Sequence, residues 1–295
     1  MAVEPETAQP EACYRHPDER TRVHCTRCGR PICPDCMTPA PVGHHCPECV
    51  REGRAAAPRR LRTVLRRPRS ATSVILGINL AVFVVELALG GSTSIPVLVR
   101  MGAMVPELVS DGQYWRLVTA LFLHVGFLHL AFNLFGLYLF GNMIEGVLGS
   151  ARFIAIYLVA GLCASAASFA FSPARTAAAG ASGALFGLLG AWLAFNLRRR
   201  SLSLAQANIQ SALMLIGLNL ALGFLLPGID NTAHLGGLAA GVVAGFAAEG
   251  VGRDRATRLV TQAAGFGALV VVAAALTAWR AADLGALAAV LRPFG

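Results

Sequence analysis

Long apolar runs separated by short polar segments dominate the chain from residue 71 onward. A helix needs about 20 residues to cross roughly 30 Å of hydrocarbon. Seven runs come near this length, and the fourth and the sixth are rich in glycine. They lie at 71–90, 127–145, 152–171, 182–197, 210–227, 233–250 and 259–280. The pattern predicts an all-α membrane protein with seven spans.

The connection between the first two predicted spans, residues 91–126, is long for a loop between membrane helices. It contains the amphipathic sequence DGQYWRLVTALFLH. A segment of this kind favours a folded element seated at the membrane interface over an irregular loop.

Composition supports the membrane assignment, because 55% of the residues are hydrophobic and only 14% are charged. All 25 basic residues are arginines, and the net charge is +9. Eight arginines at 51–69 lead directly into the first span, and further groups follow the fourth span (198–200) and the sixth (253–258). Only a cytoplasmic amino terminus places all of them inside, where they would face anionic lipid, and no nucleic acid is expected as a partner.

The chain divides by composition into five parts. Residues 1–12 are predicted to be a disordered tail, and 13–50 a compact module rich in cysteine and histidine. An arginine-rich cytoplasmic linker follows at 51–69. Six spans fill 70–250, and 251–295 holds a cytoplasmic loop, the appended seventh span and a tail.

The amino-terminal module has the composition of a metal site. The first 50 residues of the chain include no apolar stretch typical of a signal peptide. We therefore expect the module to stay in the cytoplasm, where its cysteines would be reduced. Four pairs with two intervening residues supply eight ligands, enough for two structural zinc ions. The pairs are Cys13 and His16, Cys25 and Cys28, Cys33 and Cys36, and Cys46 and Cys49. Spacing alone does not say which pairs share an ion, and His24, His44 or His45 could substitute.

Four polar side chains lie at the outer ends of the even-numbered spans. Ser182 begins the fourth span, His234 begins the sixth, and His129 and Asn133 begin the second. Polar groups in lipid are costly unless they face a protein interior or a wet cavity. Four such groups at one depth therefore predict a single site.

The residue types at this depth suit nucleophilic catalysis. His234 can act as the base that activates the Ser182 hydroxyl if the two helices approach closely. Gly237 and Gly241 follow His234 on one helix face, and Gly183 begins a similar stripe beside Ser182. His129, Asn133 and the backbone N–H of Ser182 could donate to an oxyanion. Taken singly, each pattern is also typical of a structural role, such as a serine that caps a helix.

The combined motifs resemble the rhomboid family of intramembrane serine proteases over about residues 70–250. They are Trp115-Arg116, HLAFN at 129–133, GNMIEGVLG at 141–149, GASG at 180–183 and AHLGGLAAG at 233–241. The resemblance implies a six-helix core, a Ser182–His234 dyad without a third acidic member, and an oxyanion pair of His129 and Asn133. The structural positions that it implies are Arg116, Glu145, Gly180, Gly183, Gly237 and Gly241.

Three further expectations concern residues near this site. Phe186 stands where some family members carry a tyrosine that stacks on the catalytic imidazole. Asp230 is expected to be a loop residue, and His124 a packing or interfacial residue. The amino-terminal module resembles a cross-braced B-box zinc finger, which would join the first pair with the third and the second with the fourth.

The sequence thus predicts an intramembrane serine endopeptidase with no catalytic cofactor, in a bacterial plasma membrane with its active site toward the outer face. Its substrates would be transmembrane proteins, and the zinc module could bind a cytoplasmic protein. One alternative is a catalytically inactive relative that binds membrane clients. Another is a small-molecule transporter whose zinc domain senses ligand. Broken helices, acids inside the spans or inverted repeats would favour it, and none of these is clear in the sequence.

Overall fold

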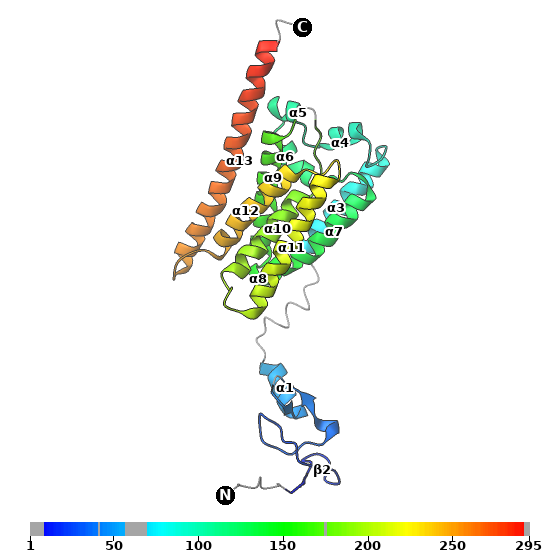
Figure 1. The fold of residues 1–295 in the computed structure, drawn as a ribbon, viewed down its shortest axis with the longest axis vertical. Coiled ribbons are helices and arrows are strands. Elements are labelled where there is room, and N and C mark those ends of the chain that lie inside the picture. The colour runs from blue at the N-terminus through cyan, green and yellow to red at the C-terminus, as the bar shows by residue number, and fades with distance from the viewer. Residues whose placement is uncertain (1–8, 41, 57–69, 174–175, 292–295) are drawn as a thin grey trace. The chain divides into compact units, whose positions relative to one another are not determined.

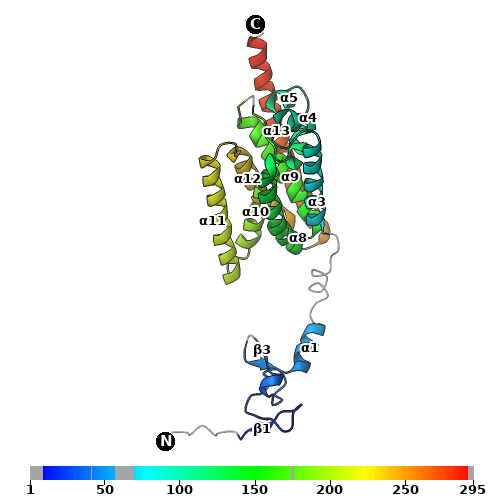
Figure 2. The same cartoon turned by 90° about the vertical axis from the view of Figure 1, so that its right-hand side faces the viewer.

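The computed structural model describes residues 9–40, 42–56, 70–173 and 176–291. The chain forms two compact units, Met1–Arg67 and Pro68–Gly295, and each is described here by itself (Figures 1 and 2). Most of the predicted tail and most of the predicted linker lie outside the described residues.

The amino-terminal unit consists of two small antiparallel hairpins and a helix. Strand β1 pairs with β2, and β3 pairs with β4. The elements are β1 (Glu11–Ala12), β2 (Arg20–Thr21), the 3₁₀ turn η1 (Pro34–Cys36), β3 (Thr38–Pro39), β4 (His44–His45) and α1 (Pro47–Ala56). Strand β1 therefore begins inside the range expected to be a tail, and α1 extends into the range expected to be a linker.

The second unit is helical throughout its described elements. Short helices fill the long first connection, as the sequence predicts. The elements are α3 (Ala71–Ala88), α4 (Ile95–Met101), α5 (Pro106–Ser110), α6 (Arg116–Thr119), η2 (Ala120–Phe122), α7 (Gly126–Gly136), the π-helical η3 (Leu137–Gly141), α8 (Asn142–Leu148), α9 (Ser150–Phe171), α10 (Ser182–Leu197), α11 (Ser203–Leu225), α12 (Asn231–Glu249) and α13 (Arg255–Leu291).

All seven predicted spans are helical, and within the described residues five of them are long and apolar enough to cross a membrane. These are α3, the continuous α7–η3–α8 segment, α9, α11 and α13. Helix α10 is shorter, with 16 residues. Helix α12 has 19 residues, but its four glycines and the polar Asn231, Thr232 and His234 of its first turn lower its mean hydropathy. The chain is therefore a multi-pass membrane protein.

Helix α10 lies at the centre of the helical unit. It packs against α9, α11 and α12, and α13 covers the outer side of α9 (Figure 1). Figure 2 shows α11 at one edge of the bundle. The largest apolar cluster joins α9, α10 and α12 through small, aliphatic and aromatic side chains, including Phe153, Tyr157 and Leu188. The glycine-rich helices thus occupy the interior of the bundle.

Glycines bring the backbones of α10 and α12 into direct contact. A Cβ added to Gly237 would overlap the carbonyl oxygen of Gly183, and one added to Gly241 would overlap that of Gly187. A Cβ on Gly190 would lie 2.5 Å from the Leu238 carbonyl oxygen. Any larger residue at these positions would force the two helices apart, so the close approach depends on the absence of side chains.

Arg116 holds the first connection together. Its guanidinium donates to the backbone oxygens of Val99 and Ala103 at 2.7 and 2.9 Å, and to Gln113 Oε1 at 2.7 Å. Beyond this hub, Met104 pairs with Ala178 in an antiparallel bridge. The connection therefore supports the segment that leads into Ser182.

Glu145 anchors the start of α3. Its carboxylate accepts from the backbone N–H groups of Ala71 and Thr72 at 2.9 and 3.0 Å, and from the Thr72 hydroxyl at 2.8 Å. The Ser150 hydroxyl donates to it at 2.6 Å. A carboxylate at a helix amino terminus satisfies free N–H groups and interacts favourably with the helix dipole. Glu145 thus joins the end of the second span to the beginning of the first.

The contact between α10 and α12 gives a stability prediction. Gly241→Ala places a methyl group against the Gly187 backbone, and overpacking of this kind typically costs about 1–3 kcal/mol. We expect a lower midpoint of thermal unfolding in detergent.

The matched control is Gly217→Ala in α11, where an added Cβ meets nothing within 4 Å. Because alanine favours a helix over glycine, this variant should be as stable as the wild type or more stable. Equal melting of the two variants would contradict the proposed role of the glycine contact.

Candidate functional site

Ser182 and His234 meet at the ends of two adjacent helices. Ser182 is the first residue of α10, and His234 lies in the first turn of α12. His234 Nε2 is 3.0 Å from Ser182 Oγ, within hydrogen-bonding distance. The glycine contact one turn further along the two helices sets this separation. The structure therefore brings together the hydroxyl and the imidazole that the sequence predicts to react.

Aromatic stacking holds the His234 ring. The Phe186 ring lies parallel to it, with the centroids 4.2 Å apart and the planes 13° apart. His234 itself is buried. Its Nδ1 atom has no hydrogen-bond partner among the residues that the structure describes. Packing against the face of the ring thus orients this histidine, and no described residue binds the Nδ1 edge where a third polar residue would act.

Asp230, the carboxylate closest to His234 in sequence, is engaged elsewhere. It precedes α12 as the amino-terminal cap, and its Oδ1 accepts from the Ala233 N–H at 2.9 Å. Its Oδ2 accepts a hydrogen bond from the Ser168 hydroxyl. Asp230 therefore positions the first turn of α12, which carries His234, and both of its oxygens are used in doing so.

His129 and Asn133 lie one turn apart on α7, and the His129 ring lies close to the serine. The position that a Cβ on Gly180 would take lies 2.9 Å from His129 Nε2 and 3.8 Å from Ser182 Oγ. Gly180 also has a φ of +142°, which other residues rarely adopt. Asn133 Nδ2 donates to the His129 carbonyl oxygen at 2.8 Å, which leaves its second hydrogen free to act. Gly180 thus keeps open the space between His129 and the serine.

The arrangement supplies the parts needed for acyl transfer. A base lies within reach of a hydroxyl, and an imidazole N–H and a side-chain amide lie on a nearby helix face. The first N–H groups of α10 provide further donors, because the first turn of a helix leaves its amides unused. A carbonyl group held between the serine and α7 would meet a nucleophile on one side and donors on the other.

The sequence prediction missed Glu86. Contrary to the expectation that the spans hold no clear acid, this residue lies in α3 and is 0% exposed. Its Oε1 accepts from the backbone N–H of His124 at 2.9 Å. The His124 ring is also 0% exposed and meets the His129 ring edge-on at a centroid distance of 5.5 Å. The sequence signal that could have identified Glu86 is a single acidic residue near the end of an apolar helix.

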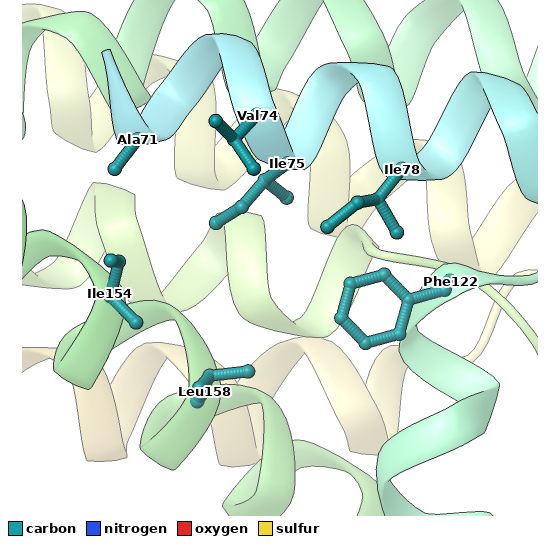
Figure 3. Close-up of a pocket in the computed structure, with 7 residues that line it drawn as sticks. All are labelled: Ala71, Val74, Ile75, Ile78, Phe122, Ile154 and Leu158. Atoms are coloured by element: carbon teal, nitrogen blue, oxygen red, sulfur yellow. The ribbon is translucent and has the colours of Figure 1, made fainter. Parts of the chain in front are cut away.

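An apolar groove of about 360 Å³ lies elsewhere on the bundle, between α3 and α9. Figure 3 shows four α3 side chains facing Ile154 and Leu158 of α9, with Phe122 beside them. The α3 residues are Ala71, Val74, Ile75 and Ile78. Only hydrocarbon side chains line this groove, so it lacks any group able to act on a peptide bond.

The amino-terminal unit holds two clusters of metal-binding side chains. In each cluster the ligand atoms lie within 4.8 Å of one another. One cluster contains Cys13, His16, Cys33 and Cys36, and the other contains Cys25, Cys28, Cys46 and Cys49. Each could hold a metal ion, and this grouping is the cross-braced one that the B-box resemblance implies. His24, His44 and His45 lie outside both clusters.

The packing of this unit fits a metal-dependent fold. Six of its cysteines form a buried cluster in which Ile32 is the one further fully buried hydrophobic residue described. Burial opposes charge on Cys13 and Cys25, but surrounding backbone N–H groups outweigh it and lower their pKa to about 6. Burial and the neighbouring thiols raise the pKa of Cys36 and Cys49 to about 12. A bound cation would favour the thiolate form of all four.

Known proteins share the helical unit. The sequence profile of the Rhomboid domain matches residues 111–249. Rhomboid protease GluP of Bacillus subtilis (strain 168) is 41% identical over 185 residues, which cover 63% of this chain and 35% of that protein. RHOMBOID-like protein 5 of Arabidopsis thaliana is 41% identical over 155 residues, which cover 52% of this chain and 50% of that protein.

A shorter relative is covered more completely. Putative rhomboid protease YdcA of Bacillus subtilis (strain 168) is 36% identical over 138 residues, which cover 47% of this chain and 69% of that protein. By contrast, the chain spans about a third of the length of GluP and half that of RHOMBOID-like protein 5. The likeness therefore concerns the helical unit that carries Ser182 and His234.

Proposed function

Because the chain belongs to the rhomboid family, we propose that it is an intramembrane serine endopeptidase that cleaves membrane-anchored proteins within or near a transmembrane segment. The observation that carries this proposal is the 3.0 Å separation between Ser182 Oγ and His234 Nε2 within a bundle of apolar helices. An inactive client-binding relative would have no need of this pair.

In the proposed reaction, Ser182 Oγ attacks the carbonyl carbon of the scissile peptide bond and its proton passes to His234 Nε2. The tetrahedral intermediate collapses when the carbon–nitrogen bond breaks, and His234 gives the proton to the leaving amine. Water then attacks the acyl-enzyme ester, with His234 again accepting and returning the proton. This sequence restores both residues without any cofactor.

Three donors would stabilise the negative oxygen of the intermediate. His129 and Asn133 belong to α7, with His129 Nε2 beside Gly180, and the Ser182 N–H belongs to the start of α10, which supports this proposal. Donors fixed in a dry site act strongly on developing charge, because they need not reorient during the reaction.

Substrates would be single transmembrane segments that unwind locally. A peptide bond inside an intact helix has its carbonyl engaged, so small or helix-breaking residues at the cleavage site would ease access. Helix α11 is the proposed gate for lateral entry. Its buried residues are few, namely Ala205, Ala212 and Ile216, and it packs mainly against α10. A weakly packed edge helix can move with little loss of contact.

The proposed location is a bacterial plasma membrane, with the amino terminus in the cytoplasm and the site toward the outer face. Charged side chains support this orientation at the ends of α10 and α12 opposite the site. Arg198 and Arg199 lie 3.3 and 2.6 Å from the carboxylate of Glu249. Their position at one level agrees with the rule that arginines favour the cytoplasmic side.

The two cysteine clusters are proposed to bind one structural zinc ion each. A Cys₃His set and a Cys₄ set are both typical of structural zinc. Metal binding would supply the folding energy that this small core lacks. The resulting module is proposed to dock a cytoplasmic protein that recruits or regulates substrates.

Replacing the proposed nucleophile tests the enzymatic function. We expect Ser182→Ala to abolish cleavage of a reporter with one transmembrane helix, and to abolish labelling by a fluorophosphonate. Ser165→Ala, a buried serine in α9, is the control and should keep both. Cleavage that persists in the alanine variant would refute the nucleophile assignment, and a wild type that binds the reporter without cleaving it would favour an inactive client binder.

Two asparagines in the second span allow a matched test of the oxyanion role. Asn133 and Asn142 each donate to the backbone oxygen four residues earlier, but only Asn133 lies on α7 one turn from His129, whereas Asn142 begins α8. We expect Asn133→Ala to lower kcat about 10²- to 10³-fold. Asn142→Ala should leave kcat near the wild-type value, and an equal loss in both variants would point to a helix defect instead.

Metal analysis tests the zinc sites. We expect two zinc ions per chain in the wild type and one after Cys25→Ser, because each cluster needs all four ligands. His44→Asn is the control and should retain two, since His44 lies outside both clusters. Removal of metal by a chelator should unfold the amino-terminal unit, as seen by circular dichroism of residues 9–56 expressed alone with metal. An ordered unit without metal would contradict this prediction.

A further inference from the structure

Glu86 belongs to a row of buried polar residues on α3. Thr72, Asn79 and Glu86 are spaced seven residues apart and are all buried, so they share one face of the helix. Thr72 binds Glu145, and Asn79 Nδ2 binds the Ile75 carbonyl oxygen within α3. A buried carboxyl group is costly unless it is hydrogen-bonded. Glu86 has one such contact, through Oε1, while its buried Oε2 has no hydrogen-bond partner among the described residues. The cost of keeping this carboxyl group points to a function.

Glu86 binds the backbone at the entrance to α7. Its Oε1 accepts from the His124 N–H at 2.9 Å. His124 lies between η2 and α7, and Val125 is the residue that caps the start of α7. The carboxyl group thus fixes the direction of one amide in the short segment that leads to His129.

The next amide along the chain reaches the His129 side chain. The Val125 N–H donates to His129 Nδ1 at 3.3 Å. A neutral imidazole that accepts at Nδ1 carries its hydrogen on Nε2. His129 Nε2 faces the space beside Gly180 and Ser182, where a donor is needed. The Val125 amide therefore selects the tautomer that can stabilise an oxyanion.

We propose that Glu86 is a positioning residue, which holds the His124–Val125 backbone so that the Val125 amide keeps His129 in its Nε2–H form. The inference rests on the proposed proteolytic function, because only an oxyanion donor requires this tautomer. Glu86 touches no reacting atom, and it acts through two consecutive amides. Its role depends on an oxygen that accepts a hydrogen bond, which either a carboxyl group or a carboxamide can supply.

Two pairs of variants test this connection, one pair at Val125 and one at Glu86. Val125→Pro removes the amide hydrogen, and its φ of −83° is close to the value that proline adopts. Val125→Ala keeps the amide and is the matched control. Glu86→Met removes the accepting oxygen at similar size, whereas Glu86→Gln keeps one. Should Glu86→Met fail to fold, the Val125 pair still decides the outcome.

We expect Val125→Pro and Glu86→Met to lower kcat about tenfold to hundredfold with KM within about threefold. The loss is smaller than the 10²- to 10³-fold cost of deleting a donor, because His129 can still visit the active tautomer. Val125→Ala and Glu86→Gln should stay within about threefold of the wild type. A kcat near wild type in Val125→Pro, or an equal loss in Glu86→Gln and Glu86→Met, would overturn the proposal.

A double-mutant cycle separates this role from simple stabilisation. If Glu86 acts through His129, then Glu86→Met should cause little further loss of kcat in a His129→Ala background. Additive losses would contradict the inference. Asn79→Leu, on the same face of α3 two turns away, serves as the control and should change thermal stability without this non-additivity.

Nitrogen-15 resonances of the His129 ring give a measurement that needs no catalysis. The wild type should show the Nε2–H tautomer, and Val125→Pro and Glu86→Met should each shift the ring toward the other form. An unchanged tautomer in Val125→Pro would overturn the inference. If the wild type neither cleaves the reporter nor reacts with a fluorophosphonate, the proposed function fails, while the resonances still decide whether Glu86 and Val125 set the tautomer.

Discussion

The site depends on one constraint, which is that two helices touch backbone to backbone. Gly237 meets the Gly183 carbonyl group, and Gly241 meets that of Gly187. Small residues permit such contacts in membranes, where van der Waals packing replaces the hydrophobic effect as the force that joins helices. The first residue of α10 and the first turn of α12 then lie side by side. The hydrogen-bonding distance between Ser182 and His234 follows from this packing.

The contact between α10 and α12 fixes the positions of two backbones. Other elements hold the hydrogen-bond donors of the site in place. The first connection supplies one support, since Arg116 gathers the backbone oxygens of Val99 and Ala103, and Met104 pairs with Ala178 just before the serine turn. Glu145 supplies another by binding the first amides of α3. Each support joins segments distant in sequence through a charged group bound to the backbone. Such bonds are stronger than neutral ones in an apolar surrounding.

Much of this organisation could be predicted from the sequence, because apolar length and arginine position are local signals. The fourth predicted span, 182–197, coincides with α10, and the two metal clusters have the grouping that the B-box resemblance implies. The α12 segment was predicted as the span 233–250 as well, although its glycines and its polar first turn make it only moderately hydropathic. Glu86 was missed because its partner is a backbone amide 38 residues away. A contact with a backbone group leaves no pattern of residue types.

The proposed reaction requires opposite tautomers of two histidines in one site. In it, His234 accepts a proton at Nε2, so its hydrogen would belong on Nδ1, and stacking on Phe186 orients the ring without dictating a charge. His129 would donate at Nε2, so its Nδ1 needs a donor, and the Val125 amide is placed to be one. A carboxylate hydrogen-bonded to Nδ1 of His129 would favour the opposite tautomer. Glu86 lies nearby, yet it binds the backbone of His124 instead. An acid held one amide away from the imidazole can therefore fix the segment without reversing the direction of the hydrogen bond.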